Sequence, residues 1–274
     1  MIRRPPRSTH CISSAASDVY KRQSQRMGFN GARLHQKVFE PRFLYWADRS
    51  GYLVWGEYPN WGLDHSHPEA LERMLTEWIE VLERDFNHPS IIGWCPFNET
   101  PPSQNPELLR SIFRVTKMID PTRPVIDTSG YVHVETDIYD CHNYEQDPKK
   151  FASYFSEFAK SDKVWRNFPE NNAPYQGQPY FVSEYGGIWW NPGQEDEKGW
   201  GYGTRPKTEK EFLERYRALT ESLLFHPKIS GFCYTQLYDI EQEVNGLYTY
   251  DRRPKFDPEI IRKINSQRAA IEGK

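Results

Sequence analysis

Short apolar segments alternate with amphipathic helical patterns along most of this 274-residue chain, and this alternation constrains the fold more than any other feature. Seven segments have the length and the apolar or aromatic content of buried strands. They span 27–35, 52–58, 91–99, 124–128, 137–144, 179–185 and 229–238. Strands that alternate with helices form a parallel sheet whose helices lie outside it.

Four stretches between these segments place apolar side chains at three- and four-residue steps, which is the spacing of one helix face. The predicted helices span 69–86, 108–119, 149–160 and 212–224, with Pro121 ending the second.

Seven strands in the 251 residues from 24 onward fit a (β/α)8 TIM barrel, a fold of about 250 residues. From residue 24 the chain opens on a strand with no helix before it, so we expect an incomplete barrel that lacks its first strand. A doubly wound open sheet is the competing architecture, and it predicts a glycine-rich phosphate loop after the first strand. Residues 36–40 contain no glycine, which favours the barrel.

The first 23 residues differ in composition from the rest. They contain five basic residues, one acidic residue and no hydrophobic period. We interpret 1–23 as a non-native or disordered segment that resembles translated sequencing-adaptor sequence, and an organellar transit peptide is the alternative. We therefore expect that the native N-terminus is absent and that 24–274 forms one barrel domain.

Composition excludes several classes of protein. The 35 Lys and Arg against 38 Asp and Glu give a net charge of −3, and the absence of a basic run argues against nucleic-acid binding. No stretch approaches 18 uninterrupted apolar residues, which argues against a membrane span. Four cysteines without a C-x-x-C pair indicate neither a disulfide scaffold nor a structural zinc motif.

Polar side chains collect at the carboxyl ends of the predicted strands, and in a barrel these ends converge on one face. The strand-end residues are Arg33, His35, Glu57, Asn98, Glu99, His142, Tyr144, Glu184, Gln236 and Asp239. By strand count, Glu99 and Glu184 lie across the barrel mouth from each other. Two carboxyl groups facing one substrate suit glycoside hydrolysis, in which one donates a proton and the other stays ionised.

Neighbouring residues support this chemistry. Asn98 is placed to bind a sugar hydroxyl, and Tyr144 is placed to donate a hydrogen bond to an ionised nucleophile. Indole rings that can stack on sugars lie in or beside strand-end segments: Trp55, Trp61, Trp94, Trp189, Trp190 and Trp200. A single strand-end glutamate is more commonly a structural ion-pair partner, so the prediction depends on the combination. We interpret Glu57 as a hydrogen-bonding residue behind the site, and a third catalytic acid is the alternative.

Asp64, His65 and His67 also suggest a metal site. Catalytic zinc needs about three protein ligands at recognisable spacing, and we therefore interpret this segment as a polar loop. No metal and no cofactor are expected.

At these residues the chain resembles the barrel domain of glycoside hydrolase family 2, the β-galactosidase and β-glucuronidase group. The segments that carry the resemblance are MGFNGARLH, PRFLYWADRSGYLVWGEYP, RDFNHPSIIGWCPFNE, DPTRPVIDTSG, QPYFVSEYGG and VNGLYTYDRRPK. The resemblance implies that Glu99 is the acid/base, that Glu184 is the nucleophile and that an exo-acting enzyme retains configuration at a β-glycoside. Its implied substrate-binding residues are Arg33, His35, Asn98, His142, Tyr144, Trp189 and Asp239. It also implies that β-sandwich domains and the first barrel strand precede Met27.

Three departures from the family pattern bear on the substrate. Arg33 and His35 are two residues apart rather than three. Thr235 stands where the family often has a tryptophan, four residues before Asp239. The stretch 243–248 lacks the lysine with which β-glucuronidases clamp the substrate carboxylate. A uronic acid would be buried without a cation, so β-galactosidase-like activity ranks above β-glucuronidase-type specificity.

Two other functions remain open: a non-catalytic carbohydrate-binding barrel, and a metal-dependent hydrolase that uses the histidines. Without its first strand the barrel exposes unpaired strand edges, which favour aggregation. We therefore expect the chain as written to be poorly soluble and inactive. The sequence leaves open the sugar, the aglycone, the compartment (the cytoplasm is slightly favoured) and the oligomeric state, a homo-oligomer included.

Overall fold

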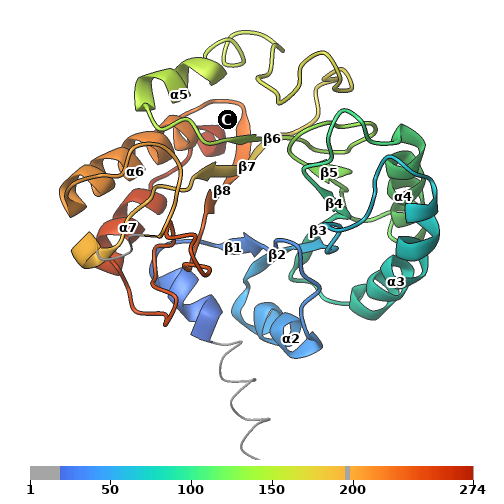
Figure 1. Ribbon diagram of the computed structural model, residues 1–274, viewed down its shortest axis with the longest axis horizontal. Helices are drawn as coiled ribbons and strands as arrows, with labels where there is room; N and C mark the ends of the chain where they lie inside the picture. Colours follow the sequence, from blue (N-terminus) through green and yellow to red (C-terminus); the bar gives the residue numbers. More distant parts are fainter. Residues whose placement is uncertain (1–18, 195–197, 274) are drawn as a thin grey trace, which may run out of the picture.

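Strands occupy the centre of the molecule, and helices form a ring around them (Figure 1). This arrangement comes from a computed structural model, which describes residues 19–194 and 198–273. In chain order the strands are β1 Gly31–Arg33, β2 Leu53–Glu57, β3 Ile91–Cys95, β4 Phe97–Asn98, β5 Thr128–Ser129, β6 Tyr139–Asn143, β7 Tyr180–Gly186 and β8 Ile229–Thr235.

Each of the seven predicted segments overlaps a strand, although 124–128 meets β5 only at Thr128. The segment 91–99 holds both β3 and β4, which are separated at Pro96, a residue with no amide hydrogen for a sheet ladder.

Every strand ladder is parallel, as the alternation of strands and helices predicts. The ladders form three groups, β1–β2–β3, β4–β5 and β6–β7–β8, and a single bridge from Trp94 to Val125 joins the first two groups. Among the described residues no ladder joins β8 to β1, so the sheet is not closed.

The helices of the outer ring are α2 Pro41–Ser50, α3 Glu69–Asp85, α4 Pro106–Ile119, α5 Pro148–Phe155, α6 Glu209–Leu224 and α7 Pro258–Asn265. The four predicted helices, α3 to α6, are confirmed. Asn105, Asp147 and Asp257 cap α4, α5 and α7 by accepting a backbone N–H, and each is followed by proline, the favoured first helical residue. The sequence analysis did not predict α2 and α7, which bury Phe43, Leu44 and Ala47 and Pro258, Ile261 and Ile264 respectively.

A helix at 19–26 precedes β1, so the prediction that the chain opens on a strand with no helix before it is wrong. The sequence of this helix has no apolar periodicity. Individual hydrogen bonds attach the helix to the rest of the fold. The buried Lys21 ammonium donates to the Phe43 carbonyl at 3.3 Å, and the Tyr52 hydroxyl donates to Ser24 Oγ at 2.7 Å. The predicted boundary at residue 23 lies inside this helix, and residues 1–18 lie outside the described part of the chain.

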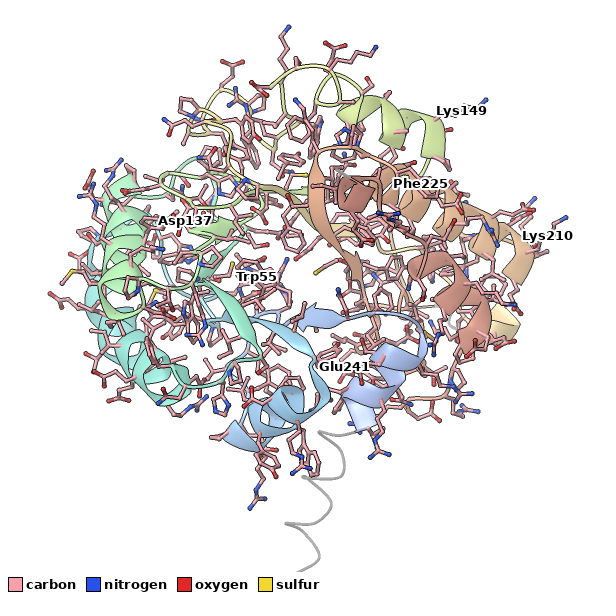
Figure 2. The ribbon with its side chains drawn as sticks, turned by 180° about the vertical axis from the view of Figure 1, so that it is seen from behind. Trp55, Asp137, Lys149, Lys210, Phe225 and Glu241 are labelled. Atoms are coloured by element: carbon pink, nitrogen blue, oxygen red, sulfur yellow. The ribbon has the colours of Figure 1, made fainter. Side chains whose placement is uncertain are left out.

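A small cluster of side chains fills the interior of the ring of strands. Trp55, Cys95, Ile126 and Phe181 pack together, with the Trp55 and Phe181 rings stacked 6.0 Å apart. Trp55 lies near the middle of the molecule in Figure 2, whereas Lys149 and Lys210 lie at its periphery. In the described part of the chain, no helix combines the length and the apolar character needed to cross a membrane.

A cavity of about 1640 Å³ runs between β1 and β8. Residues 29–35 form one wall and residues 230–240 form the opposite wall. Glu99, Tyr144 and Glu184 also line this cavity, so the predicted catalytic carboxyl groups open into it.

Candidate active site

Glu99 follows β4 directly and adopts a left-handed backbone conformation with φ of 52°. For a residue other than glycine this conformation costs on the order of 1 kcal/mol or more. The Glu99 N–H donates to the Ser129 carbonyl of β5 at 2.9 Å, which holds the backbone in place. Strained backbone of this kind is concentrated at functional sites.

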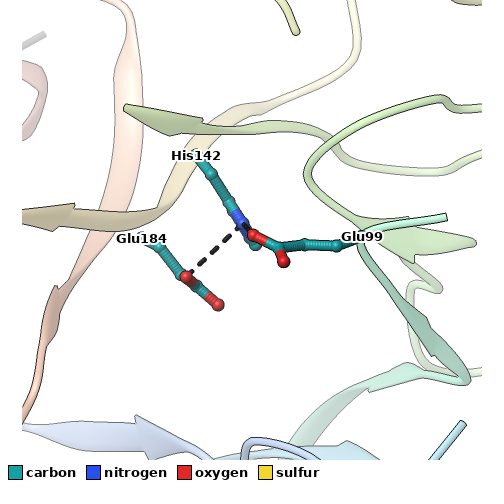
Figure 3. A group of neighbouring side chains, drawn as sticks. All are labelled: Glu99, His142 and Glu184. Carbon is teal, nitrogen blue, oxygen red and sulfur yellow. Dashed lines mark hydrogen bonds and ion pairs between the residues drawn. The ribbon is translucent and has the colours of Figure 1, made fainter. Parts of the chain in front are cut away.

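Glu184 lies on β7, and its side chain meets those of Glu99 and His142 (Figure 3). One oxygen from each carboxyl group and one ring nitrogen of His142 all lie within 4.8 Å of one another. This approach of the nearest oxygens favours the separation of about 5–5.5 Å between the carboxyl groups of retaining glycosidases over the 6.5–9.5 Å of inverting enzymes.

The Arg33 guanidinium lies beneath these groups, with its side chain only 4% exposed. Nη2 donates to Glu184 Oε1 at 2.6 Å, to His35 Nδ1 at 2.8 Å and to Asn98 Oδ1 at 2.9 Å. Nε donates to the fully buried Glu57 carboxylate. Glu57 thus accepts a hydrogen bond from Arg33 behind the site, and Arg33 connects it to the nucleophile candidate.

The environment of Glu184 favours its ionised form. Burial alone raises the pKa of this carboxyl group, but His142, Arg33 and His35, together with a hydrogen bond from Tyr144, outweigh burial and lower the pKa to about 2. Burial and the charge of Glu184 raise the pKa of the Tyr144 hydroxyl, so Tyr144 stays protonated and donates to Glu184.

His35 lies at the rim of the site, with its side chain 43% exposed. Burial and the neighbouring Arg33 lower the pKa of its ring, so the ring is neutral at neutral pH and accepts the arginine hydrogen bond through Nδ1. The His35 and Trp61 rings pack in a T-shaped arrangement, with their ring centroids 5.2 Å apart.

Asn98 presents an unused donor to the site. Its Oδ1 accepts from Arg33, and its backbone N–H donates to Asn60 Oδ1 at 3.0 Å. Its Nδ2 is buried and has no hydrogen-bond partner among the described residues. An unsatisfied buried amide is costly, but Asn98 is fully buried and is not among the described residues that line the cavity.

Two predicted substrate-binding residues, Asp239 and Trp189, contact other protein groups. Asp239 Oδ1 accepts from Lys255 Nζ at 2.7 Å and from the Gly246 N–H at 2.9 Å, contacts that hold the loop after β8. The Trp189 indole lies 4.6 Å from the Arg205 guanidinium and is not among the described residues that line the cavity. Their roles in binding substrate remain predictions.

Other aromatic rings do line the cavity. Trp61 and Trp200 are 58% and 45% exposed in its wall. Tyr202, which the sequence analysis missed, stacks flat on Tyr144 with ring centroids 3.6 Å apart. Tyr202 lies in a loop far from any predicted strand end, so the sequence carried no signal for it.

Ser129 and Glu243 were also missed. Ser129 ends β5 and receives a hydrogen bond from Arg33 Nη1 at 2.8 Å. Glu243 lines the cavity, and its carboxylate accepts from Asn245 Nδ2 at 3.0 Å. The position of Ser129 at a strand end was the available signal for it, whereas Glu243 lies beyond the last strand.

Glu99, His142 and Glu184 offer three ligand atoms for a metal ion. The Arg33 guanidinium already neutralises Glu184 at 2.6 Å, and a second cation beside it would be repelled. Asp64 and His67 are 3.6 Å apart and both 66% exposed, and His65 contacts Asn60 at 3.0 Å. These contacts fit the polar loop that the sequence indicates.

Residues 25–268 match the family model of the TIM barrel domain of glycosyl hydrolases family 2. The chain belongs to this family. This family 2 barrel is 27% identical over 175 residues to a β-glucuronidase of Chlorocebus aethiops, covering 58% of this chain and 26% of the relative. It is also 27% identical over 179 residues to a β-galactosidase of Vibrio cholerae, covering 62% of this chain and 17% of the relative.

Among solved structures, the crystal structure of an FMN-binding β-glucuronidase from Facaelibacterium prausnitzii matches with a TM-score of 0.73. The match covers 93% of this chain and 41% of that chain at 17% identity, so the likeness is one of fold. The chain spans about a quarter or less of the length of the two curated relatives. These matches confirm the predicted TIM barrel domain of family 2.

Proposed function

We propose that residues 24–274 form the catalytic barrel of a retaining exo-β-glycosidase that acts on neutral sugars, with β-galactosidase-like specificity. In the first step a Glu184 carboxylate oxygen attacks the anomeric carbon. The glycosidic C–O bond breaks, and the leaving oxygen takes the proton of Glu99. In the second step Glu99 removes a proton from water, whose oxygen attacks the anomeric carbon and returns the electron pair to Glu184.

The observation that carries this proposal is the approach of the Glu99 and Glu184 carboxyl groups within 4.8 Å in unequal electrostatic surroundings. Glu184 has an arginine at 2.6 Å and a tyrosine hydroxyl as donors. Glu99 is paired only with His142 among the described residues. The Arg33 cation keeps Glu184 ionised, as a nucleophile requires. Glu99 has no such cation, which suits a group that must carry a proton.

The rest of the site fits a sugar. Asn98 precedes Glu99 in the chain, and its Nδ2 has no partner among the described residues. A side-chain movement would have to bring this buried donor to the cavity before it could bind a sugar hydroxyl. Trp61 and Trp200 give the cavity exposed indole faces on which a sugar ring or an aglycone can stack.

Glu243 favours a neutral sugar over a uronic acid. The cavity wall formed by residues 235–243 includes no cation among its described lining residues. Glu243 and Glu184 both line the cavity, and burial, together with repulsion by Glu184, raises the pKa of the Glu243 carboxyl group. A uronate carboxylate there would meet a like charge, whereas sugar hydroxyls would donate to it. We therefore favour galactoside over glucuronide, although relatives of both names match.

Hydrolysis of a panel of aryl β-glycosides by the complete protein that carries this barrel tests the proposal. We expect cleavage of a neutral glycoside, β-galactoside first, with kcat/KM at least about 100-fold above that for the glucuronide, because like charges a few ångströms apart cost several kcal/mol. NMR of the first-formed sugar should show the β-anomer. Faster cleavage of the glucuronide would overturn the sugar assignment, and a first-formed α-anomer would overturn retention.

Two controls address the other candidate functions. Isothermal titration that shows sugar binding without any hydrolysis would establish a non-catalytic carbohydrate-binding barrel. Loss of activity in a chelator, restored by added metal, would establish a metal-dependent hydrolase. We expect full activity in the chelator.

We also propose that the barrel lacks one strand, which belongs between β8 and β1. Two observations support this: neither edge has a partner on that side among the described ladders, and the large cavity separates them. A parallel strand there would complete the eight strands of a closed barrel, since β3 and β4 form one barrel strand.

A further inference from the structure

His142 lies between the two carboxyl groups that exchange charge in the proposed reaction (Figure 3). Its Nδ1 is 2.7 Å from Glu99 Oε1 and 3.4 Å from Glu184 Oε2. The ring is 2% exposed, so bulk water does not compete for these contacts. The sequence placed His142 among the substrate-binding residues, but its polar atoms face protein groups on both sides.

The far side of the ring determines which nitrogen carries the proton. Nε2 lies 3.0 Å from Ser129 Oγ and 3.4 Å from Arg33 Nη1. A guanidinium N–H can only donate, so Nε2 is an acceptor and the ring proton is on Nδ1. The single ring N–H is therefore directed at the two catalytic carboxyl groups.

The backbone holds the ring in this orientation. Gly130 has a φ of 63°, and a Cβ atom at this position would lie 2.6 Å from the His142 ring, so glycine makes room for it. The Gly130 N–H donates to Asp140 Oδ1 at 3.0 Å. Asp140 Oδ2 also lies 3.1 Å from Ser129 Oγ, so the group next to Nε2 is itself fixed. The one hydroxyl hydrogen of Ser129 goes to Nε2, which accepts it at 3.0 Å. The remaining neighbour is the Tyr131 ring, 6.3 Å away.

We propose that His142 is a positioning residue whose one ring N–H follows the negative charge between Glu184 and Glu99 during the reaction. The inference rests on the function proposed above. In this structure Nδ1 is hydrogen-bonded to Glu99 at 2.7 Å and lies 3.4 Å from Glu184. Before the first step, with Glu184 ionised and Glu99 protonated, the N–H turns from Glu99 to Glu184. As Glu184 forms the ester and Glu99 gives its proton to the leaving oxygen, the N–H turns to the new Glu99 carboxylate. Hydrolysis of the ester reverses the change.

This role predicts an effect that depends on the leaving group. When a poor leaving group departs, Glu99 must become negative, and the N–H stabilises that charge in the transition state. When 2,4-dinitrophenolate departs, no proton is needed, Glu99 stays neutral, and the N–H has no new charge to stabilise. A hydrogen bond to a charged group is worth about a 10- to 100-fold change in rate.

The test compares kcat/KM for phenyl and 2,4-dinitrophenyl β-glycosides of the sugar that the wild type cleaves. We expect His142→Ala to lower kcat/KM about 10- to 100-fold for the phenyl glycoside and less than about threefold for the dinitrophenyl glycoside. His142→Asn, which restores an N–H near the Nδ1 position, should recover most of the loss. Asn143→Ala, on the same strand, is the matched control and should change neither value.

Equal losses for both leaving groups in a folded variant would overturn the inference, because a distorted site affects every substrate alike. A rise in KM with unchanged kcat would also overturn it in favour of a substrate-binding role. A wild type that cleaves no glycoside overturns the proposed function and, with it, this inference. Thermal melting of each variant separates loss of fold from loss of rate.

Discussion

Arg33 Nη2 donates to Glu184 Oε1 at 2.6 Å across the interior of the barrel, from β1 to β7. The same guanidinium pairs with Glu57 on β2. One buried cation therefore neutralises a structural carboxylate and the proposed nucleophile together, and the fold and the chemistry depend on the same residue.

Loss of the Arg33 charge should impair stability and activity. Arg33→Gln leaves Glu57 and Glu184 facing each other without a cation, which costs about 3–5 kcal/mol of unfolding free energy. Arg33→Lys keeps the positive charge, so its free energy of unfolding should fall less than that of Arg33→Gln. Urea unfolding of both variants measures this difference, and equal stability of Arg33→Gln and the wild type would contradict the pairing.

The pH profile of kcat/KM should follow the charges around Glu184, those of His142 and Arg33 above all. The pKa of Glu184 is lowered from 4.5 to about 2, so the nucleophile stays ionised as pH falls until about 2. Weakening this environment raises the pKa towards 4.5, and activity is then lost at higher pH. We expect Arg33→Lys, with its single point charge in place of the fork, to move the acid limb upward. An acid limb that did not move would show that Arg33 does not set this pKa.

Removing the Tyr144 hydroxyl should lower kcat with little effect on KM. Tyr144→Phe keeps the ring stacked on Tyr202 and removes only the donor to Glu184. We expect a loss of about 10- to 100-fold in kcat, the value of one hydrogen bond to a charged group. Steady-state kinetics on the best aryl glycoside measures it, and an unchanged kcat would exclude Tyr144 from the chemistry.

The buried His133 should stabilise the protein in a pH-dependent way. Burial lowers the pKa of its ring, but Asp127 and Asp140, at 2.7 and 3.0 Å, outweigh burial and raise the pKa well above 6.5. The contribution of protonated His133 to the free energy of unfolding is complete below pH 6.5. It is lost as pH rises through the raised pKa. The stability gap between wild type and His133→Leu should therefore narrow at alkaline pH. A gap that is constant with pH would show that the ring is neutral.

The open edge of β8 should promote aggregation of the chain as written. Ser230 is exposed on this strand and lines the cavity between β8 and β1. Lysine on an edge strand discourages pairing between molecules, so Ser230→Lys should reduce light scattering at equal concentration. Ser156→Lys, exposed at the end of α5, is the control and should have no effect. Equal scattering by all three proteins would argue against aggregation through this edge.

The approach of Glu99 and Glu184 was predictable because parallel strands end at the same rim. Each residue lies at the carboxyl end of a recognisable apolar segment. The alternation of strands and helices along the chain was enough to place both residues on that rim. The carboxylate pair and Tyr144 therefore follow from local patterns and one topological rule.

The other contacts depend on features that local sequence does not encode. The long side chain of Arg33 contacts seven other described residues. Its orientation depends on the register of β1 against β2 and on the distance to β7. The ion pair of Asp239 with Lys255 forms only when the loop after β8 folds back. The helix at 19–26 was missed because its sequence has no apolar period.

The most direct test is mass spectrometry of the complete protein after reaction with a 2-deoxy-2-fluoro β-glycoside that carries a good leaving group. The fluorine slows hydrolysis of the glycosyl ester, so the intermediate should accumulate with one fluoroglycosyl group per chain. Peptide mapping should place this group on Glu184, and Glu184→Ala should carry none. An adduct on Glu99 or on another residue, or turnover of ordinary substrate without any adduct, would contradict the assignment of Glu184 as the nucleophile.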